Sequence, residues 1–437
     1  MGKLGATRAA GLAAGVMAVL LSSAARAELQ AVAEVGVGYS DNIRRNNANK
    51  VEETIGTAGL QLDWDQRTRR IDGEATVDLS YFEYLDNTFE SEVVGTANGS
   101  LAVDLLADRL QWVFEDSFGQ AQDDPFAPTT PETREDLNFF STGPNLMVRL
   151  GATGFAQLFG RWSQTTYETS PLDAERTTAG LTLGRRASER TELTLNGVAE
   201  EIDFDSDVNT DYERKSAFVG YQLDAARTLI TANVGYTWLE LDGSDDTSGS
   251  ALVNVSVARD LSASSTLQLT LSSQLGDAGD ALRGGLAGGI VGAGSQITAT
   301  SDPFENRVAS LEYRFFRNRT GFTLGASLTD DDYETQSQLD RKGKVYSASF
   351  TRRMARTLDF ELTAALYDEE FQSTGLQSDE LRYGAALSWR AFRTLGWRLL
   401  AERYDRDTND ASGEYQENRV FLTLAYYWGA GDAPAQR

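Results

Sequence analysis

The sequence predicts an all-β membrane protein: one transmembrane antiparallel up-and-down β-barrel of about 18–20 strands, twenty being favoured, preceded by a cleaved signal peptide. Three observations predict this fold. Apolar and polar residues alternate in runs of about ten residues. Short and long links between these runs alternate along the chain, and every Trp lies on the apolar side of its run. No linker interrupts this texture between residues 29 and 428, so a single domain is expected.

Alternation is the dominant signal along the chain. Between Ile71 and Tyr81 the odd positions are apolar or small and the even positions are polar. Because a strand sends successive side chains to opposite faces, each such run has one apolar and one polar face. The runs are centred near residues 36, 60, 76, 100, 113, 146, 160, 180, 196, 219, 234, 254, 270, 310, 325, 348, 362, 385, 400 and 423.

The links between the runs are of two kinds, and the two kinds alternate. Short links include 66–69, 107–109, 151–154, 187–190, 225–226, 317–319, 354–356 and 393–396. Long, polar links include 43–52, 119–136, 203–211, 241–248, 277–302, 331–340 and 407–416. A meander built this way has its turns at one end and its loops at the other, as in outer-membrane barrels with periplasmic turns and extracellular loops.

The Trp residues favour a membrane barrel over a soluble sheet protein. A β-sandwich would also place Trp on an apolar face, but it would not need the alternation of turns and loops. No blade-length or coil-length repeat supports a propeller or a β-helix. The residues expected in aromatic girdles at the membrane interfaces are Trp64, Trp112, Trp162, Trp238, Trp389, Trp397 and Trp428.

The first 27 residues are typical of a secretory signal peptide. Lys3 and Arg8 precede the apolar stretch 11–21, and Ala25-Arg26-Ala27 is a small-x-small cleavage site. We therefore expect a signal peptide at 1–27, the barrel at 28–428 and a short tail at 429–437. Export through such a signal, followed by barrel strands, predicts the outer membrane of a Gram-negative bacterium.

Composition removes several functional classes. The chain has no His and no Cys, which excludes Ser-His-Asp hydrolases, thiol chemistry and histidine or thiolate metal sites. Its net charge is −25, and an acidic chain is a poor partner for nucleic acid. We expect no enzyme, no cofactor and no nucleic-acid partner, although a carboxylate-only hydrolase in the lumen stays open without any pair standing out.

Acidic clusters in the long links raise the question of calcium. Asp245-Asp246 and Asp330-Asp331-Asp332 could bind Ca²⁺, but they lack the spacing of a defined calcium loop. Charge that is simply solvated on a loop accounts for them better, so the sequence names no metal residue.

The polar faces of the strands supply a lumen of mixed charge. These residues either solvate a water-filled interior or form a selectivity surface, in which Arg would suit carboxylate or sulfate groups. The longest link, 277–302, is rich in Gly and Ala; it either folds into the barrel as a constriction or stays outside. The candidate lumen-lining residues are Asp63, Glu74, Asp78, Arg149, Arg161, Glu312, Arg314, Glu361, Arg382 and Arg390.

The start of the expected barrel carries a family resemblance. Residues 34–43, EVGVGYSDNI, resemble the opening strand of the outer-membrane proteins grouped as "β-barrel porin 2", and related barrels occur in exopolysaccharide-export and PEP-CTERM gene clusters. One departure is that Trp428 is not terminal, because residues 429–437 follow it.

The resemblance implies a function and partners. It implies a barrel tied to the export of a surface polysaccharide. Together with the polar lumen faces and the missing catalytic residues, it predicts a passive outer-membrane pore for a polar solute, a secreted exopolysaccharide above all, with outer-membrane lipid and periplasmic export components as partners. The alternative is a non-conducting structural or assembly barrel of the outer membrane.

Overall fold

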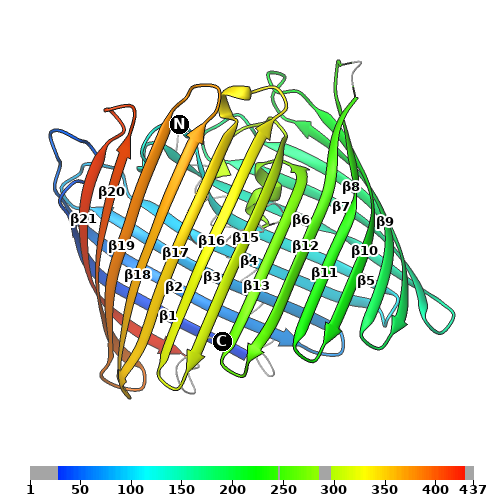
Figure 1. Ribbon diagram of the computed structural model, residues 1–437, viewed down its shortest axis with the longest axis horizontal. Coiled ribbons are helices and arrows are strands. Elements are labelled where there is room, and N and C mark those ends of the chain that lie inside the picture. The colour runs from blue at the N-terminus through cyan, green and yellow to red at the C-terminus, as the bar shows by residue number, and fades with distance from the viewer. Residues whose placement is uncertain (1–27, 245–246, 285–296, 429–437) are drawn as a thin grey trace.

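The computed structural model describes residues 28–244, 247–284 and 297–428, so the expected signal peptide and C-terminal tail lie outside the described residues. The described chain forms one large barrel of tilted strands (Figure 1). Twenty long strands build its wall within these residues: β1 (Glu28–Ser40), β2 (Glu53–Arg67), β3 (Ile71–Tyr84), β4 (Glu92–Leu106), β5 (Leu110–Gln122), β6 (Arg134–Leu150), β7 (Gly154–Tyr167), β8 (Ala174–Ser188), β9 (Thr191–Phe204), β10 (Tyr212–Ala225), β11 (Thr228–Leu241), β12 (Thr247–Ser262), β13 (Ser265–Gly276), β15 (Phe304–Arg317), β16 (Thr320–Tyr333), β17 (Arg341–Ala355), β18 (Leu358–Phe371), β19 (Gln377–Arg390), β20 (Leu395–Thr408) and β21 (Tyr415–Trp428).

The wall closes on itself. Each of these strands pairs antiparallel with the next, and β1 pairs antiparallel with β21 from Ala31↔Trp428 to Ser40↔Arg419. Closure gives every wall strand two neighbours, which is what hydrocarbon requires because it cannot hydrogen-bond a free strand edge. The predicted barrel of twenty antiparallel strands, closed first to last, is confirmed.

The alternation in sequence becomes an outer and an inner face. In β1, Val35, Val37 and Tyr39 point outward and are 59%, 57% and 43% exposed, while Gly36 and Gly38 lie on the inner face. Exposed large apolar side chains recur on the outer face of strand after strand around the barrel. Soluble proteins rarely expose apolar patches on this scale, so the outer face suits lipid.

The two ends of the barrel differ. Turns of a few residues join β2 to β3, β4 to β5 and so on at one end, and the longer links lie at the other, upper end in Figure 1. Asp108, Gly151 and Asn318 stand in three of the tight turns with φ of 58°, 74° and 58°. Asp, Asn and Gly tolerate this left-handed conformation best, which fits them to these turns.

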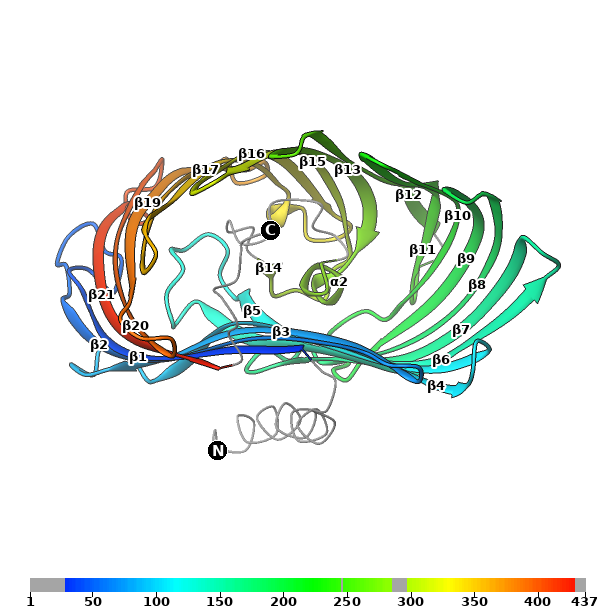
Figure 2. The ribbon, with the colours of Figure 1, turned by 90° about the horizontal axis from the view of Figure 1, so that it is seen from below.

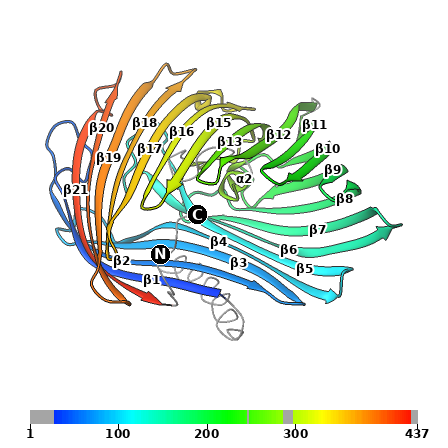
Figure 3. The same cartoon turned by 60° about the horizontal axis from the view of Figure 1, so that its bottom comes forward.

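Three small elements depart from the wall: the helix α2 (Ala278–Leu282), β14 (Ile297–Thr298) and the 3₁₀ turn η1 (Ser337–Leu339). Seen along its axis, the barrel is a flattened oval, with α2 and β14 inside it (Figure 2). In the tilted view, α2 again lies within the ring of strands (Figure 3). No helix in the described part of the chain is long and apolar enough to cross a membrane.

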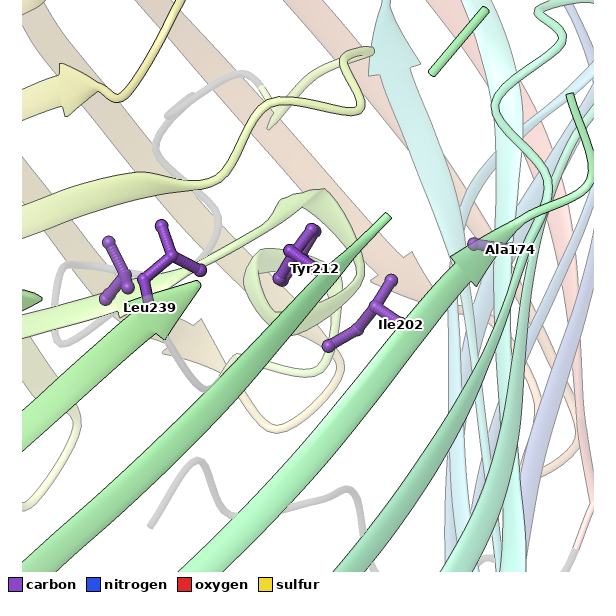
Figure 4. Packing of buried hydrophobic residues seen from close by; sticks show 5 residues of the cluster. Ala174, Ile202, Tyr212 and Leu239 are labelled. Atoms are coloured by element: carbon purple, nitrogen blue, oxygen red, sulfur yellow. The ribbon is translucent and has the colours of Figure 1, made fainter. Parts of the chain in front are cut away.

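Apolar packing inside the barrel gathers at the long-loop end. The largest cluster joins Ala174, Ile202, Tyr212, Leu239 and Leu275, and Figure 4 shows the first four coming from the neighbouring strands β8 to β11. The cluster lies beside α2, because Tyr212 donates a hydrogen bond to Asp277 at the start of that helix. The interior core therefore surrounds the segments that fold into the lumen rather than filling the whole barrel.

Candidate functional site

The strand register places all ten predicted lumen residues on the inner face. Arg214 on β10 contacts α2 inside the barrel, so its side chain defines the inner face. Residues paired across two strands point to the same face, so the register identifies the inner face of every other strand. The residues are spread over the wall and do not converge on one point. Their role in lining a pore stays a prediction; the ten are Asp63, Glu74, Asp78, Arg149, Arg161, Glu312, Arg314, Glu361, Arg382 and Arg390.

Most of these residues have local partners. Arg314 pairs with Glu312 two residues away on its own strand, Arg161 donates to Asn145, and Glu361 accepts from an Arg on β20 at 3.5 Å. Arg149 lies in the rim at the short-turn end, with its side chain 75% exposed. Pairing within a strand or between nearby strands is what a lumen that is simply solvated predicts.

The seven Trp residues all lie on the outer face by the same register. Five stand in the half of the barrel nearer the short turns, and Trp162 and Trp238 stand in the other half. Six are 37–51% exposed, whereas Trp64 is buried, with its ring against Gly73 and close to Leu101. The two levels are those expected for aromatic residues at two membrane interfaces, and the girdle itself stays a prediction.

Two long links fold into the lumen and meet there. We call residues 123–133, 277–284 and 297–302 together the lumen plug. β14 pairs parallel with the end of β5, Ile297 with Ala121 and Thr298 with Gln122. Phe126 and Ala281 pack against the same buried cluster at Leu339, so both links share one packing unit.

This arrangement decides one alternative that the sequence leaves open. In its described parts, the link 277–302 is an inward-folded segment and not an external loop. Its Gly- and Ala-rich middle, residues 285–296, lies outside the described residues. A chain segment of this size inside the barrel narrows the lumen at the long-loop end.

An ion-pair network holds α2 to the wall. We call Arg176, Glu200, Arg214, Asp277 and Asp280 the plug anchor. Arg176 donates to Asp280 Oδ1 at 2.8 Å and also to Asp277. Arg214 donates to Asp280 Oδ2 and to Glu200, each at 2.8 Å.

The plug anchor is buried and its charges are answered. Arg176 and Arg214 are 4% and 6% exposed, and three carboxylates face them. Burial raises the pKa of Asp280, but attraction to Arg176, Arg214 and Arg283 outweighs burial, and the pKa lies well below its usual range. Asp280 is therefore ionised at neutral pH and held by charge-assisted hydrogen bonds.

A second group of arginines lies on the opposite side of the lumen. Arg45, from the link after β1, donates from Nε to Glu417 at 3.0 Å and from Nη1 to the Thr129 carbonyl at 2.7 Å. Its guanidinium lies over the rings of Tyr404 and Tyr415, at 4.9 and 5.1 Å from their centroids. Arg45 thus ties the other half of the plug to β20 and β21.

Beside Arg45 the inner wall is hollowed. A cavity of about 60 Å³ lies between β17, β18, β19 and β20, near the long-loop end. Three arginines line it, with two glutamates and a tyrosine among the other lining residues: Arg341, Arg382, Arg406, Glu369, Glu380 and Tyr367. We call this the arginine pocket. Arg382 also packs on Tyr367, at 4.4 Å from the ring centroid.

The acidic stretch 330–332 is split by its strand. Because side chains alternate on β16, Asp331 points inward while Asp330 and Asp332 point outward. Asp331 accepts from Arg341 and Asn306, and Arg307 pairs with the other two. In the described ranges no group of three acidic side chains is placed to hold a metal ion, and Asp245-Asp246 lies outside those ranges.

Sequence reasoning missed the residues that organise the interior. Arg176, Arg214 and Arg406 are not among the predicted lumen residues, although each lies on the inner face of its strand. The sequence offers one modest signal: the link 277–302 carries Asp277 and Asp280 among small residues. If such a segment is buried, its carboxylates need cationic partners on the wall. Arg45 was not singled out, because it lies in a link where alternation says nothing.

Comparison with known proteins gives similarity in structure only. No protein-family model matches the chain, and no protein of curated function matches it. The FrpB iron transporter of Neisseria meningitidis aligns with a TM-score of 0.46 at 11% identity, over 94% of this chain and 82% of that one. A mutant of the ferric enterobactin receptor PfeA of Pseudomonas aeruginosa aligns with a TM-score of 0.45 at 11% identity, over 92% and 80%.

A third solved structure matches over nearly its whole length. OccK2 (OpdF) of Pseudomonas aeruginosa aligns with a TM-score of 0.39 at 12% identity, over 92% of this chain and 98% of that one. The assignment of a membrane barrel therefore rests on the closed strand pairing and the apolar exterior described above. The resemblance of residues 34–43 to the porin 2 proteins stays a prediction.

Proposed function

We propose that the protein is a channel of the outer membrane of a Gram-negative bacterium, with a polar lumen narrowed by the lumen plug. One observation carries this proposal: a closed barrel presents apolar side chains outward and charged side chains inward, around inward-folded links. An apolar exterior fits lipid, and a charged interior fits water and polar solutes. The apolar signal peptide and its removal on export belong to this proposal.

The proposed solute is a polar polymer, a secreted exopolysaccharide, handed over by periplasmic export components. The resemblance of the first strand supports this choice. The inner wall supports it too, because it offers carboxylates, arginines and tyrosines, the groups that hydrogen-bond and stack on sugars. We propose no catalytic role, since the titratable residues of the lumen are spread over the wall and several of them stand in ion pairs.

A flux assay with liposomes tests the channel. Purified protein is reconstituted, and the swelling rate is measured in neutral sugars of increasing size. We expect wild type to admit small sugars, and Arg176→Gln/Arg214→Gln to admit larger ones because the plug loses its anchor. A Gln substitution at Arg398, an inner-wall residue outside the plug, is the matched control and should leave the size limit unchanged.

A structural barrel that conducts nothing is the alternative, and one observation favours it. The plug anchor is buried, and each of its two arginines pairs with at least two carboxylates, so the plug is held firmly in the lumen. If liposomes with wild type and with the anchor variant are both impermeable, the channel proposal is wrong. The lumen would then serve only to brace the barrel.

A further inference from the structure

One arginine in the lumen wall lacks the partner that its neighbours have. Arg406 lies on the inner face of β20 and is only 7% exposed. Within the described chain its guanidinium makes no hydrogen bond and no ion pair, and its Nε is shielded from solvent without an acceptor. Buried charges in proteins are normally paired, so this cation stands out.

The carboxylates around Arg406 attract it only from beyond ion-pair distance, because each lies closer to another cation. In the arginine pocket, Arg341 pairs with Asp331 at 2.8 Å and with Glu369 at 3.4 Å, and Arg382 pairs with Glu380. Glu380 faces Arg406 across the β19–β20 pairing, yet no oxygen of it lies within ion-pair distance of Arg406. The third carboxylate of the pocket, Asp368, pairs with Lys344 at 2.9 Å, so each carboxylate of the pocket pairs with a cation other than Arg406.

A second unpartnered group stands next to Arg406. Tyr415 is directly opposite Arg406 in the β20–β21 register, on the same inner face, and is 2% exposed. Its hydroxyl is buried and has no hydrogen-bond partner within the described chain. Buried tyrosine hydroxyls usually find a partner, so a second polar group without one lies on the neighbouring strand, although Tyr415 does not line the cavity.

A cavity lies beside Arg406. The cavity that Arg406 lines measures about 60 Å³ and is also bordered by Ser378. One water needs roughly 10–15 Å³ by such a measure, so the cavity holds a few waters or one small oxyanion group. Guanidinium nitrogens in a planar fork match the two oxygens of a carboxylate.

We propose that the arginine pocket is a binding site for the carboxylate of an acidic sugar, received by Arg406. The site deepens the proposed function, since it names the class of solute: a sugar acid, or a polymer containing one. It lies just inside the mouth at the long-loop end, a few residues before β20 ends at Thr408. A solute moving through that mouth meets the pocket beside the lumen plug.

Equilibrium binding to the detergent-solubilised, full-length barrel tests the site without any need for conduction. Isothermal titration compares galacturonate with galactose, which differ by the carboxylate, and with acetate, which is the carboxylate alone. We expect saturable binding of galacturonate, no binding of galactose and weaker binding of acetate. Equal binding of acetate would assign the site to a free small anion and overturn the sugar-acid proposal.

Variants of Arg406 supply the decisive comparison. Arg406→Gln should weaken galacturonate binding by about tenfold or more, because a charge-assisted, two-pronged contact is lost. Arg398→Gln, on the same strand and inner face but outside the pocket, should bind like wild type. If Arg406→Gln does not fold, Arg406→Lys replaces it, with a smaller expected loss of affinity because lysine keeps the charge and loses the two-pronged contact.

Several results would overturn the proposal. Wild-type affinity in Arg406→Gln, or equal binding of galactose and galacturonate, would remove the pocket as a carboxylate site. The binding result and the flux result test the site and the channel separately. Binding by a barrel that passes no sugar in liposomes would contradict the channel alone, and sugar flux without binding would contradict the site alone.

Discussion

Two groups of arginines line the same lumen and differ in whether each guanidinium is paired with a carboxylate. In the plug anchor, Arg176 and Arg214 meet the carboxylates of Asp277 and Asp280 within 2.8 Å, and each arginine makes several hydrogen bonds. In the arginine pocket, Arg406 is equally buried and has no acceptor among the described residues. Both groups belong to the long-loop half of the barrel, so depth in the lumen does not explain the difference.

The difference separates a structural network from a site with capacity to bind. A buried network whose charges all have partners fixes the segments that carry them, here the plug against the wall. A buried cation without a partner leaves free energy of solvation unrecovered, and a ligand anion can recover it. Whether a buried arginine has a carboxylate partner is therefore a better guide to function in this lumen than the presence of the arginine itself.

The largest expected effect comes from removing one charge from each group. Asp280→Asn leaves Arg176 and Arg214 short of a partner in a buried site, which costs about 3–5 kcal/mol in such networks. Hydrogen exchange of residues 277–284 should lose protection. Arg406→Gln removes a cation that has no partner, so exchange at the same residues should stay as in wild type, and equal losses in both variants would abolish the distinction.

The comparison presupposes that both groups face the lumen and not the lipid, and neighbouring substitutions on β11 test this. Val234 is on the outer face and Asn233 on the inner face. Val234→Arg should destabilise the barrel by about 2–4 kcal/mol in lipid vesicles, because it puts a charge in hydrocarbon. Asn233→Arg should cost much less in the same urea titration, and the reverse order would invert the faces.

Removing a carboxylate should have opposite consequences in the two groups. Glu200 accepts from Arg214 in the plug anchor, and Glu200→Gln should weaken plug docking by about 1.5–3 kcal/mol, seen as faster exchange in α2. Glu380 answers Arg382 in the arginine pocket, and Glu380→Gln should tighten galacturonate binding severalfold by leaving a second cation free. Weaker binding in Glu380→Gln would show that the pocket needs its carboxylate.

The smallest expected effect is the response of the plug to acid. The pKa of Asp280 is lower in the folded protein than its ordinary value of 3.8, so its stabilising contribution is present above pH 3.8 and is lost as pH falls below that value. Hydrogen exchange in residues 277–284, corrected for the intrinsic rate, should be constant from pH 7 to about pH 4. Loss of protection already near pH 6 would contradict the ionised, paired state of Asp280.

Much of the wall followed from the sequence because two periodic constraints act together. Alternation assigned faces, so Asp63 and Glu361 were placed on the polar side and Trp238 on the apolar side before any pairing was known. Tight links such as 107–109 force neighbouring strands to pair, and repeated pairing in order predicts an up-and-down meander. Closure followed because an open edge is costly in hydrocarbon.

The interior could not be predicted in the same way. Arg176 and Asp280 are 104 residues apart, and Arg45 and Glu417 are 372 apart, so no local pattern links them. Links carry no alternation of polar and apolar residues, so the sequence does not decide whether the segment 277–302 folds into the barrel or stays outside it. The absence of a partner at Arg406 is a property of packing and does not show in the residue type or its spacing.

Single-channel recording in planar bilayers tests the central claim most directly: a polar lumen narrowed by a plug whose position depends on paired charges. Wild type and Asp280→Asn are recorded in the same salt at pH 7. We predict steady, small currents from wild type and currents severalfold larger from Asp280→Asn, as α2 leaves the wall. No current from either protein, in preparations that are folded by heat-modifiable migration, would contradict the account.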